Sequence, residues 1–393
     1  MTALDEPPRP AVPAEVLTIA GTLEAAGHEA WCVGGALRDA LLGHAEADFD
    51  LATSATPDEV LRLFPRTVPV GIRFGTVGVL DRARRLHEVT TFRRDVETDG
   101  RHAVVAFGAS LEDDLARRDF TINALAYHPG RGEWRDPFGG RADLAAGVVR
   151  AVGDPMQRFR EDYLRVLRGL RFAARFGFRI DEPTWRAMTA AVPGLAGLSA
   201  ERVREEWFKG LATARSIPAL VRLWRESGAA ATWLPELLET TLEIPAAERD
   251  PVLLTALLTH DPVAVLRRLK ASNAELQRAA AIVAAPAQPA SVDERAVRRW
   301  MGATGRALDD RLVLARWRGG AEPAWGAMVR QIRERGDALS RDQLAIGGDD
   351  LRAQGVAPGP DLGRLLDRLL ERVLDDPSLN TRERLLALAR ELG

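Results

Sequence analysis

Strand-like patterns end near residue 150 of this 393-residue chain, and that change constrains the fold more than any other feature. Between residues 29 and 150 the apolar period shifts repeatedly, and short runs at 76–80, 86–92 and 103–107 are rich in β-branched or aromatic residues. After residue 150 almost every apolar pattern has the helical period. The sequence therefore predicts an α+β fold: an N-terminal α/β head, with a small mixed sheet and helices, followed by an all-α neck, body and tail.

The same patterns predict four segments along the chain. We expect an N-terminal tail and helix over 1–28, the head over 29–150, a helical neck over 151–212 and a helical body and tail over 213–393. Two further helices are predicted where the chemistry concentrates. One covers residues 113–127, and the other is a long amphipathic helix over 155–177 that ends at Gly177.

Composition excludes several classes of protein. A single cysteine, Cys32, rules out a disulfide framework and a Cys-based zinc site, so we expect a reducing cytoplasm. No apolar run has the roughly 18 residues that a membrane span requires. The formal net charge of −2 gives no general attraction to nucleic acid, but residues 158–179 hold seven arginines against two acids. A strongly basic region is therefore hidden in a nearly neutral chain.

Two adjacent glycines follow a predicted strand at 30–33 and precede a short helix. Gly34 and Gly35 allow backbone N–H groups to approach an anion. Arg38 lies one helical turn later and can add a charge-assisted hydrogen bond to a phosphate. A Gly-Gly pair is also common in ordinary tight turns, so the phosphate-binding and the structural interpretations both stay open at this point.

Two aspartates in the next predicted strand favour a metal site. Asp48 and Asp50 are two residues apart, so both carboxylates point to one face of a strand, where they repel unless a cation binds them. Mg²⁺ bound by one or two carboxylates and by substrate phosphates satisfies that requirement. Glu88, in the predicted strand at 86–92, is a candidate third acid for a two-metal site. Solvated carboxylates are the alternative at all three positions.

Two more groups of side chains suit a nucleotide. In the predicted helix at 113–127, Asp119 and Asn123 share a face and can bind ribose hydroxyls, while Arg118 can bind a triphosphate. In the predicted neck helix, residues three apart offer carboxylate and guanidinium groups that match the donor and acceptor edges of cytosine and adenine. These residues are Asp162, Arg165, Arg168 and Arg171. Ordinary helix surfaces with ion pairs are the alternative in both segments.

In their order along the chain, these motifs resemble the class II nucleotidyltransferases, which comprise CCA-adding tRNA nucleotidyltransferases and bacterial poly(A) polymerases. The matching motifs are VGGALRD (33–39), DFDLAT (48–53), VGIRFGTVGVL (70–80), EVTTFRRD (88–95), DLARRDFTINALAY (114–127), DPFGGRADL (136–144) and EDYLRVLRGLRF (161–172). The resemblance covers the head and the neck, and it is thinner beyond residue 210.

The resemblance implies a role for most of the candidate residues. Asp48 and Asp50 are expected to hold two Mg²⁺ ions, with Glu88 as a third catalytic acid. The residues that the resemblance implies for the nucleotide are Gly35, Arg38, Arg118, Asp162, Arg165, Arg168 and Arg171, and we add Asp119 and Asn123 from their place in the segment at 113–127. Of these, Asp162 and Arg165 are expected to select the base.

The activity implied by the resemblance is addition of CCA to the 3′ end of tRNA from CTP and ATP, without a template and with release of pyrophosphate. The stretch at 68–80 resembles the CCA-adding members, and residues 93–107 resemble the loop with which full CCA-adding enzymes switch from C to A, including a DGRH sequence at 99–102. A poly(A) polymerase, or an enzyme adding only CC or only A, is the alternative within the family. A non-catalytic RNA-binding protein, or a nucleotidyltransferase acting on proteins or small molecules, is the alternative outside it.

Overall fold

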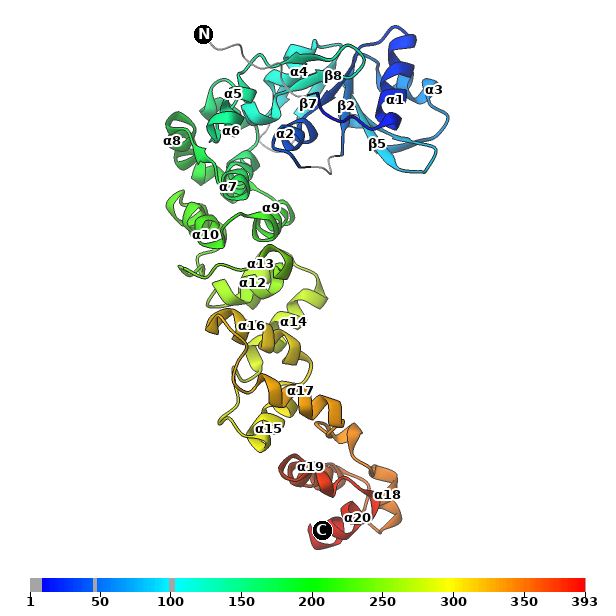
Figure 1. Cartoon of the computed structure of the whole chain (residues 1–393), viewed down its shortest axis with the longest axis vertical. Coiled ribbons are helices and arrows are strands. Elements are labelled where there is room, and N and C mark those ends of the chain that lie inside the picture. Colours follow the sequence, from blue (N-terminus) through cyan, green and yellow to red (C-terminus); the bar gives the residue numbers. More distant parts are fainter. Residues whose placement is uncertain (1–8, 45–47, 99–102, 393) are drawn as a thin grey trace. The chain divides into compact units, whose positions relative to one another are not determined.

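The N-terminal part of the chain is built around a mixed sheet (Figure 1). The computed structural model describes residues 9–44, 48–98 and 103–392. The seven-stranded sheet has the order β3-β4-β5-β2-β1-β8-β9, and within it β2 and β5 pair in parallel. Its strands are β1 (Ala30–Val33), β2 (Asp50–Thr53), β3 (Thr67–Gly71), β4 (Thr76–Leu80), β5 (Leu86–Thr91), β8 (Ala126–His128) and β9 (Glu133–Arg135).

Two smaller pairs of strands accompany this sheet. An antiparallel pair is formed by β6 (Arg93–Thr98) and β7 (Ala103–Phe107). A parallel pair is formed by β10 (Val148–Val149) and β11 (Arg179–Ile180). The first two helices of the helical region lie between these strands in the sequence.

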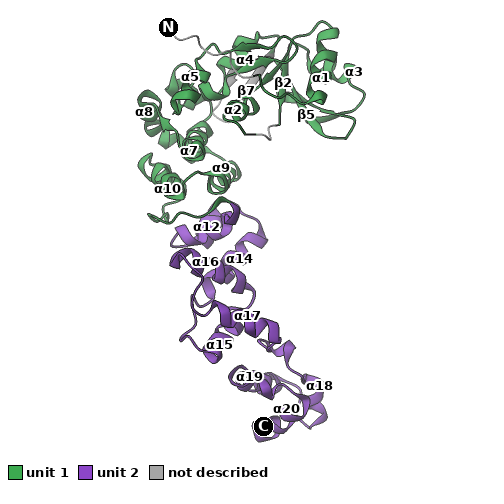
Figure 2. Ribbon diagram, in the orientation of Figure 1, with its two compact units in different colours: residues 1–246 green, residues 247–393 purple. Residues whose placement is uncertain are grey.

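The chain divides into two compact units, residues 1–246 and residues 247–393 (Figure 2). The helices of the first unit are α1 (Ala14–Ala25), α2 (Gly35–Leu41), α3 (Pro57–Leu63), α4 (Leu111–Ala116), α5 (Gly140–Ala146), α6 (Pro155–Glu161), α7 (Leu164–Phe176), α8 (Glu182–Ala191), α9 (Ala200–Thr213), α10 (Ile217–Glu226) and α11 (Ala229–Trp233). The finer boundaries predicted at residues 150 and 212 stay predictions.

The described part of the second unit is helical. Its helices are α12 (Pro251–Leu258), α13 (Pro262–Arg268), α14 (Asn273–Ala284), α15 (Glu294–Thr304), α16 (Leu308–Gly319), α17 (Gly326–Arg335), α18 (Gly348–Ala353), α19 (Pro360–Asp375) and α20 (Arg382–Leu392). The predicted fold class, a head with a mixed sheet followed by helices, is therefore confirmed. Among the described helices, none has the length and the apolar character needed to cross a membrane.

The single helix predicted over 113–127 is wrong. Helix α4 ends at Ala116, a short 3₁₀ turn covers Thr121–Asn123, and β8 begins at Ala126. The backbone hydrogen bonds of this stretch go to a distant segment: Thr121 N donates to the Arg150 carbonyl at 2.9 Å, and Val152 N donates to the Asp119 carbonyl at 3.2 Å. These tertiary bonds replace the helical ones because Phe120, Thr121 and Ile122 are weak helix formers.

The long helix predicted over 155–177 is also wrong, although its predicted end at Gly177 is confirmed by a left-handed φ of 69°. The helix is interrupted at Asp162, which has an extended φ of −157° between α6 and α7. The Asp162 carboxylate accepts a hydrogen bond from Leu164 N at 3.0 Å, which offers the backbone an alternative to the helix.

The prediction that both aspartates lie in one strand is wrong for Asp48. Strand β2 begins at Asp50, opposite Val33 at the end of β1. Because Gly34 turns the chain away with a φ of 78°, β1 supplies no backbone partner for Asp48.

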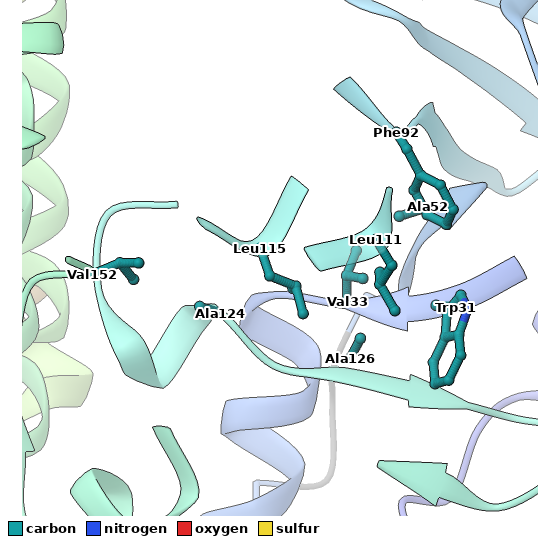
Figure 3. Close-up of a cluster of buried hydrophobic side chains, with 9 residues drawn as sticks. All are labelled: Trp31, Val33, Ala52, Phe92, Leu111, Leu115, Ala124, Ala126 and Val152. Carbon is teal, nitrogen blue, oxygen red and sulfur yellow. The ribbon is translucent and has the colours of Figure 1, made fainter. Parts of the chain in front are cut away.

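A buried cluster fixes α4 against the sheet (Figure 3). Leu111 and Leu115 of α4 lie beside Val33 and Trp31 of β1 and Ala126 of β8, and Leu115 is fully buried. Because α4 ends at Ala116, this packing also fixes where the following residues enter the interior.

We therefore expect Leu115→Ala to lower the free energy of unfolding by about 2–5 kcal/mol, the usual cost of a cavity of this size. Urea denaturation followed by tryptophan fluorescence measures the change. Leu17→Ala is the matched control, because Leu17 is 43% exposed on α1 and should change stability by less than about 0.5 kcal/mol. Equal effects of the two substitutions would contradict the assigned core.

Candidate active site

A polar cavity of about 590 Å³ in the first unit brings together most of the predicted site residues. It is lined by Gly34, Gly35, Arg38, Asp50, Arg117, Arg118, Asp119, Asn123, Asp162, Leu164, Arg165, Arg168, Arg171, Phe172, Arg175, Arg202 and Lys209. Ten of the twelve predicted residues are in this set; Asp48 and Glu88 are not. Nine cationic side chains face three carboxylates, so the cavity favours a ligand with several negative charges.

The two glycines allow arginines to approach the backbone. A Cβ atom on Gly34 would lie 2.9 Å from Arg118 Nη1, and a Cβ atom on Gly35 would lie 3.3 Å from Arg38 Nη2. Gly34 also has a φ of 78°, which side chains rarely tolerate. The glycine pair is therefore required by the packing of two guanidinium groups, beyond the needs of a tight turn.

Arg38 is buried and held on several sides. Its Nη1 donates to Asn123 Oδ1 at 2.5 Å, and its Nε donates to Asp39 at 2.9 Å. The guanidinium lies 5.0 Å from the ring centre of Phe172 and 4.9 Å from that of Phe176. Burial lowers the pKa of Arg38, and the charge of Asp39 opposes that change. The side chain is thus a fixed cation at the cavity wall.

Asp119 organises the centre of the cavity. Its carboxylate accepts hydrogen bonds from Phe120 N at 2.8 Å, Asn123 Nδ2 at 2.9 Å and Arg168 Nε at 2.7 Å. Burial alone would raise the pKa of Asp119, but the charge of Arg168 and these hydrogen bonds lower it to about 2. Asp119 and Asn123 therefore do contact each other, as expected, although not along one helix. Together they orient Arg168 and Arg38.

Arg117 and Arg118 share a buried carboxylate that sequence reasoning missed. Asp114 accepts from Arg117 Nη2 at 2.7 Å and from Arg118 Nη2 at 3.2 Å, and it is 1% exposed. These charges outweigh the effect of burial and lower the pKa of Asp114. Its spacing, three and four residues before the arginines on or beside α4, was a usable signal in the sequence.

The residues around the break between α6 and α7 are also paired. Asp162 accepts from Arg202 Nη2 at 2.6 Å. Arg165 donates to Glu161 at 2.7 Å and to the Arg117 carbonyl at 2.9 Å. Asp162 and Arg165 thus line one cavity with fixed orientations, even though Asp162 is outside the helix.

Arg171 is held from a different helix. Its Nε donates to Glu206 of α9 at 2.5 Å, and its guanidinium lies 4.2 Å from the ring centre of Phe172. Glu206 is 4% exposed, so it is a buried structural carboxylate. Long-range partners of this kind have no local sequence signal. The residues missed for that reason, which hold or line the cavity, are Asp39, Arg175, Arg202 and Glu206.

The predicted metal acids flank one another at the edge of the cavity. The parallel register of Leu51 with Val89 places Asp50 of β2 beside Glu88 of β5. Burial raises the pKa of Asp50 to about 6, and the charges of Glu88 and Asp48 add to the rise. The charge of Arg118 opposes the rise only in part, and such crowded carboxylate oxygens fit a hard divalent cation. Among the described residues, no three His, Cys, Asp or Glu side chains gather closely enough to hold a metal by themselves.

The loop sequence DGRH at 99–102 lies outside the described residues, so its expected role is not tested.

The Asp119–Arg168 pair predicts a pH-dependent contribution to stability. Because the pKa of Asp119 falls from 3.8 to about 2, its stabilisation is present above pH 4 and is lost as the pH falls toward 2. Asp119→Asn should lower the free energy of unfolding at pH 7 by about 2 kcal/mol. The difference from the wild type should shrink below pH 4 in urea titrations. A difference that stays constant down to pH 2.5 would contradict the ion pair.

Three family models together match most of the chain. Residues 30–150 match the poly A polymerase head domain, residues 177–240 match the "Probable RNA and SrmB- binding site of polymerase A", and residues 251–389 match tRNA nucleotidyltransferase domain 2. The chain is 36% identical to a CCA-adding enzyme of Geobacillus stearothermophilus over 96% of both chains. It is 34% identical to a CCA-adding enzyme of Streptococcus mutans, again over 96% of both.

Solved structures agree with these relatives. The structure of the Bacillus stearothermophilus CCA-adding enzyme in complex with CTP aligns with a TM-score of 0.79 and 32% identity over 96% of both chains. The Thermotoga maritima CCA-adding enzyme complexed with tRNA_CCA has the same fold, with a TM-score of 0.68 and 21% identity over 97% of both chains. The chain therefore belongs to the CCA-adding enzyme family of nucleotidyltransferases.

Proposed function

We propose that this protein adds CCA to the 3′ end of tRNA, using CTP and ATP and releasing pyrophosphate. The observation that carries the proposal is the cavity in which cationic side chains, held by buried acids, converge beside Asp50. Relatives named CCA-adding enzymes match the chain over almost its whole length, which supports the same reaction here. Its place is the cytoplasm, since the single cysteine is typical of a reducing compartment.

The triphosphate is assigned to the guanidinium groups beside the glycine pair. Arg38 and Arg118 present planar donor groups that match phosphate oxygens, and lysine does not offer the same fork. Arg168 and Arg171 add positive charge from α7. Because buried carboxylates already orient these side chains, little entropy is lost when the nucleotide binds.

Asp48, Asp50 and Glu88 are the residues that would hold Mg²⁺. When bound, two such ions supply Lewis-acid activation of the RNA 3′-hydroxyl and neutralise charge on the leaving pyrophosphate. The carboxylates would hold the ions, and the arginines of the cavity would hold the triphosphate beside them.

Base selection is assigned to Asp162 and Arg165. Cytosine presents an N4 amino group and adenine an N6 amino group, and each also presents a ring nitrogen that accepts a hydrogen bond. Asp162 would accept from the amino group and Arg165 would donate to the ring nitrogen. Their ion pairs with Arg202 and Glu161 support this role, because a fixed pair of edges can discriminate bases without a template strand.

The proposal predicts the products formed from a tRNA transcript that lacks CCA. The purified protein should add two residues with CTP alone and three with CTP and ATP together, and it should add none with ATP alone. Denaturing gel electrophoresis sizes the products. Long tails with ATP alone would indicate a poly(A) polymerase, addition that stops after two residues would indicate a CC-only enzyme, and one residue added only to a transcript ending in CC would indicate an A-only enzyme. Retained RNA binding without any product would indicate a non-catalytic protein.

Loss of either metal acid should remove catalysis but leave RNA binding. Asp48→Asn or Asp50→Asn should reduce nucleotide incorporation by at least about a thousandfold, because each removes a charge that the cations require. Filter binding should give the same tRNA affinity as the wild type within about twofold. Asp58→Asn on the surface of α3 is the control and should keep full activity. Substantial incorporation by the Asp50 variant would exclude the metal assignment.

Removing the acceptor edge should relax base selection. Asp162→Ala should lower the preference for CTP and ATP over GTP and UTP by about tenfold or more, as expected for one lost polar pair. Single-nucleotide incorporation assays with each of the four nucleotides measure the ratio of kcat/KM values. An unchanged ratio would remove Asp162 from base reading.

A further inference from the structure

An exposed apolar surface lies on the sheet face that carries Asp50 and Glu88. Glu88 of β5 is directly opposite Gly78 of β4, and Leu86 is two residues before Glu88 on the same face. A Cβ atom on Gly78 would lie 2.5 Å from Leu86 Cδ1 and 2.8 Å from Val70 Cγ2. The side chains of Leu86 and Val70 therefore close over the glycine, beside the candidate metal acids.

This surface continues along β3 and into the 3₁₀ turn Ile72–Phe74. We call it the apolar strip, and it consists of Val68, Val70, Ile72, Phe74 and Leu86, which are 38% to 47% exposed. In the sheet order, β3 lies three strand spacings from β2, or about 14 Å. The strip thus begins next to Glu88 and leads to the edge of the sheet, over a length that a few nucleotides can cover.

Exposed arginines lie in the segments that form or flank the strip in the sequence, although two of them, Arg66 and Arg82, line a cavity beside helix α1. Five of them occur within twenty residues of sequence, and all five are exposed: Arg66, Arg73, Arg82, Arg84 and Arg85. Within the described part of the chain, none of these guanidinium groups forms a salt bridge. The arginines of the cavity, in contrast, are mostly held by carboxylates. Cations left without internal partners remain available to phosphate groups.

We propose that the apolar strip, with the adjacent Arg73, Arg84 and Arg85, binds the unpaired 3′-terminal nucleotides of the RNA substrate, with bases on the strip and phosphates on the arginines. This inference rests on the proposed function. Proteins that bind single-stranded nucleic acid combine these same two elements, a stacking surface and a basic border. The strip also leads to Asp50, where the 3′-hydroxyl must lie for the reaction.

The structure disfavours a second copy of the chain as the occupant. Although β3 is an edge strand, Pro69 in its middle has no N–H to donate to an added strand. Two copies would also bring two sets of unpaired arginines together. An RNA strand, in contrast, neutralises them.

The test is steady-state kinetics with a tRNA transcript that lacks CCA. Val70→Ser combined with Leu86→Ser should raise the KM for the transcript by about tenfold or more, since stacking on one base is worth about 1–3 kcal/mol. The KM for CTP should stay unchanged. Leu17→Ser on α1, which is 43% exposed, is the matched control and should behave as the wild type. Thermal unfolding checks that the variants are folded.

The arginines give a second, independent readout. The triple variant Arg73→Gln, Arg84→Gln and Arg85→Gln should lower the slope of log affinity against log salt concentration by about 2, the value for three lost contacts to a single strand. Arg62→Gln on the same domain is the control. If the wild type extends the transcript and the variants have the same KM for the transcript and the same salt slope, the proposed role of the strip is wrong. A wild-type protein that extends no transcript would overturn the proposed function and the strip with it.

Discussion

The ion pair between Asp119 and Arg168 is the interaction on which the rest of the site depends. Asp119 is 7% exposed, and it contacts Asn123, which in turn accepts a hydrogen bond from Arg38. One buried carboxylate thereby links α7 to α2 and to the turn after α4. Asp114 likewise holds Arg117 and Arg118, and Glu206 holds Arg171. Burying a guanidinium group costs solvation free energy, and a specific carboxylate partner offsets that cost for each of these arginines. The array of arginines is therefore formed before any ligand binds.

Preformed arginines suit an enzyme that works without a template. A polymerase that reads a template can take its specificity from base pairing, whereas a template-independent enzyme has only its own side chains to present hydrogen-bonding edges. Guanidinium groups that a carboxylate holds on one side keep their other N–H groups for such edges, with little loss of entropy on binding. We propose that the paired arginines of the cavity recognise the nucleotide, whereas the unpaired arginines beside the apolar strip recognise the RNA.

Much of the architecture was predictable from the sequence, because local patterns determine it. The strands β1, β4 and β5 and the end of α7 at Gly177 all follow from neighbouring residues. One wrong helix failed because a distant group, the Arg150 carbonyl, accepts the hydrogen bond of Thr121 N. The other failed because a local side chain, the Asp162 carboxylate, accepts the hydrogen bond of Leu164 N. Most of the cavity was predicted because its residues lie in local sequence motifs. Glu206 and Arg202 were missed because their partners lie 35 and 40 residues away in the sequence.

The central claim, that buried acids position arginines for the nucleotide, is tested most directly by a double-mutant cycle on CTP affinity. Isothermal calorimetry on the wild type, Asp119→Asn, Arg168→Gln and the double variant measures the coupling. The account predicts that each single variant weakens CTP binding and that the double variant binds no more weakly than the weaker single one. Losses that simply add, or an Asp119 variant that binds CTP as the wild type does, would contradict it.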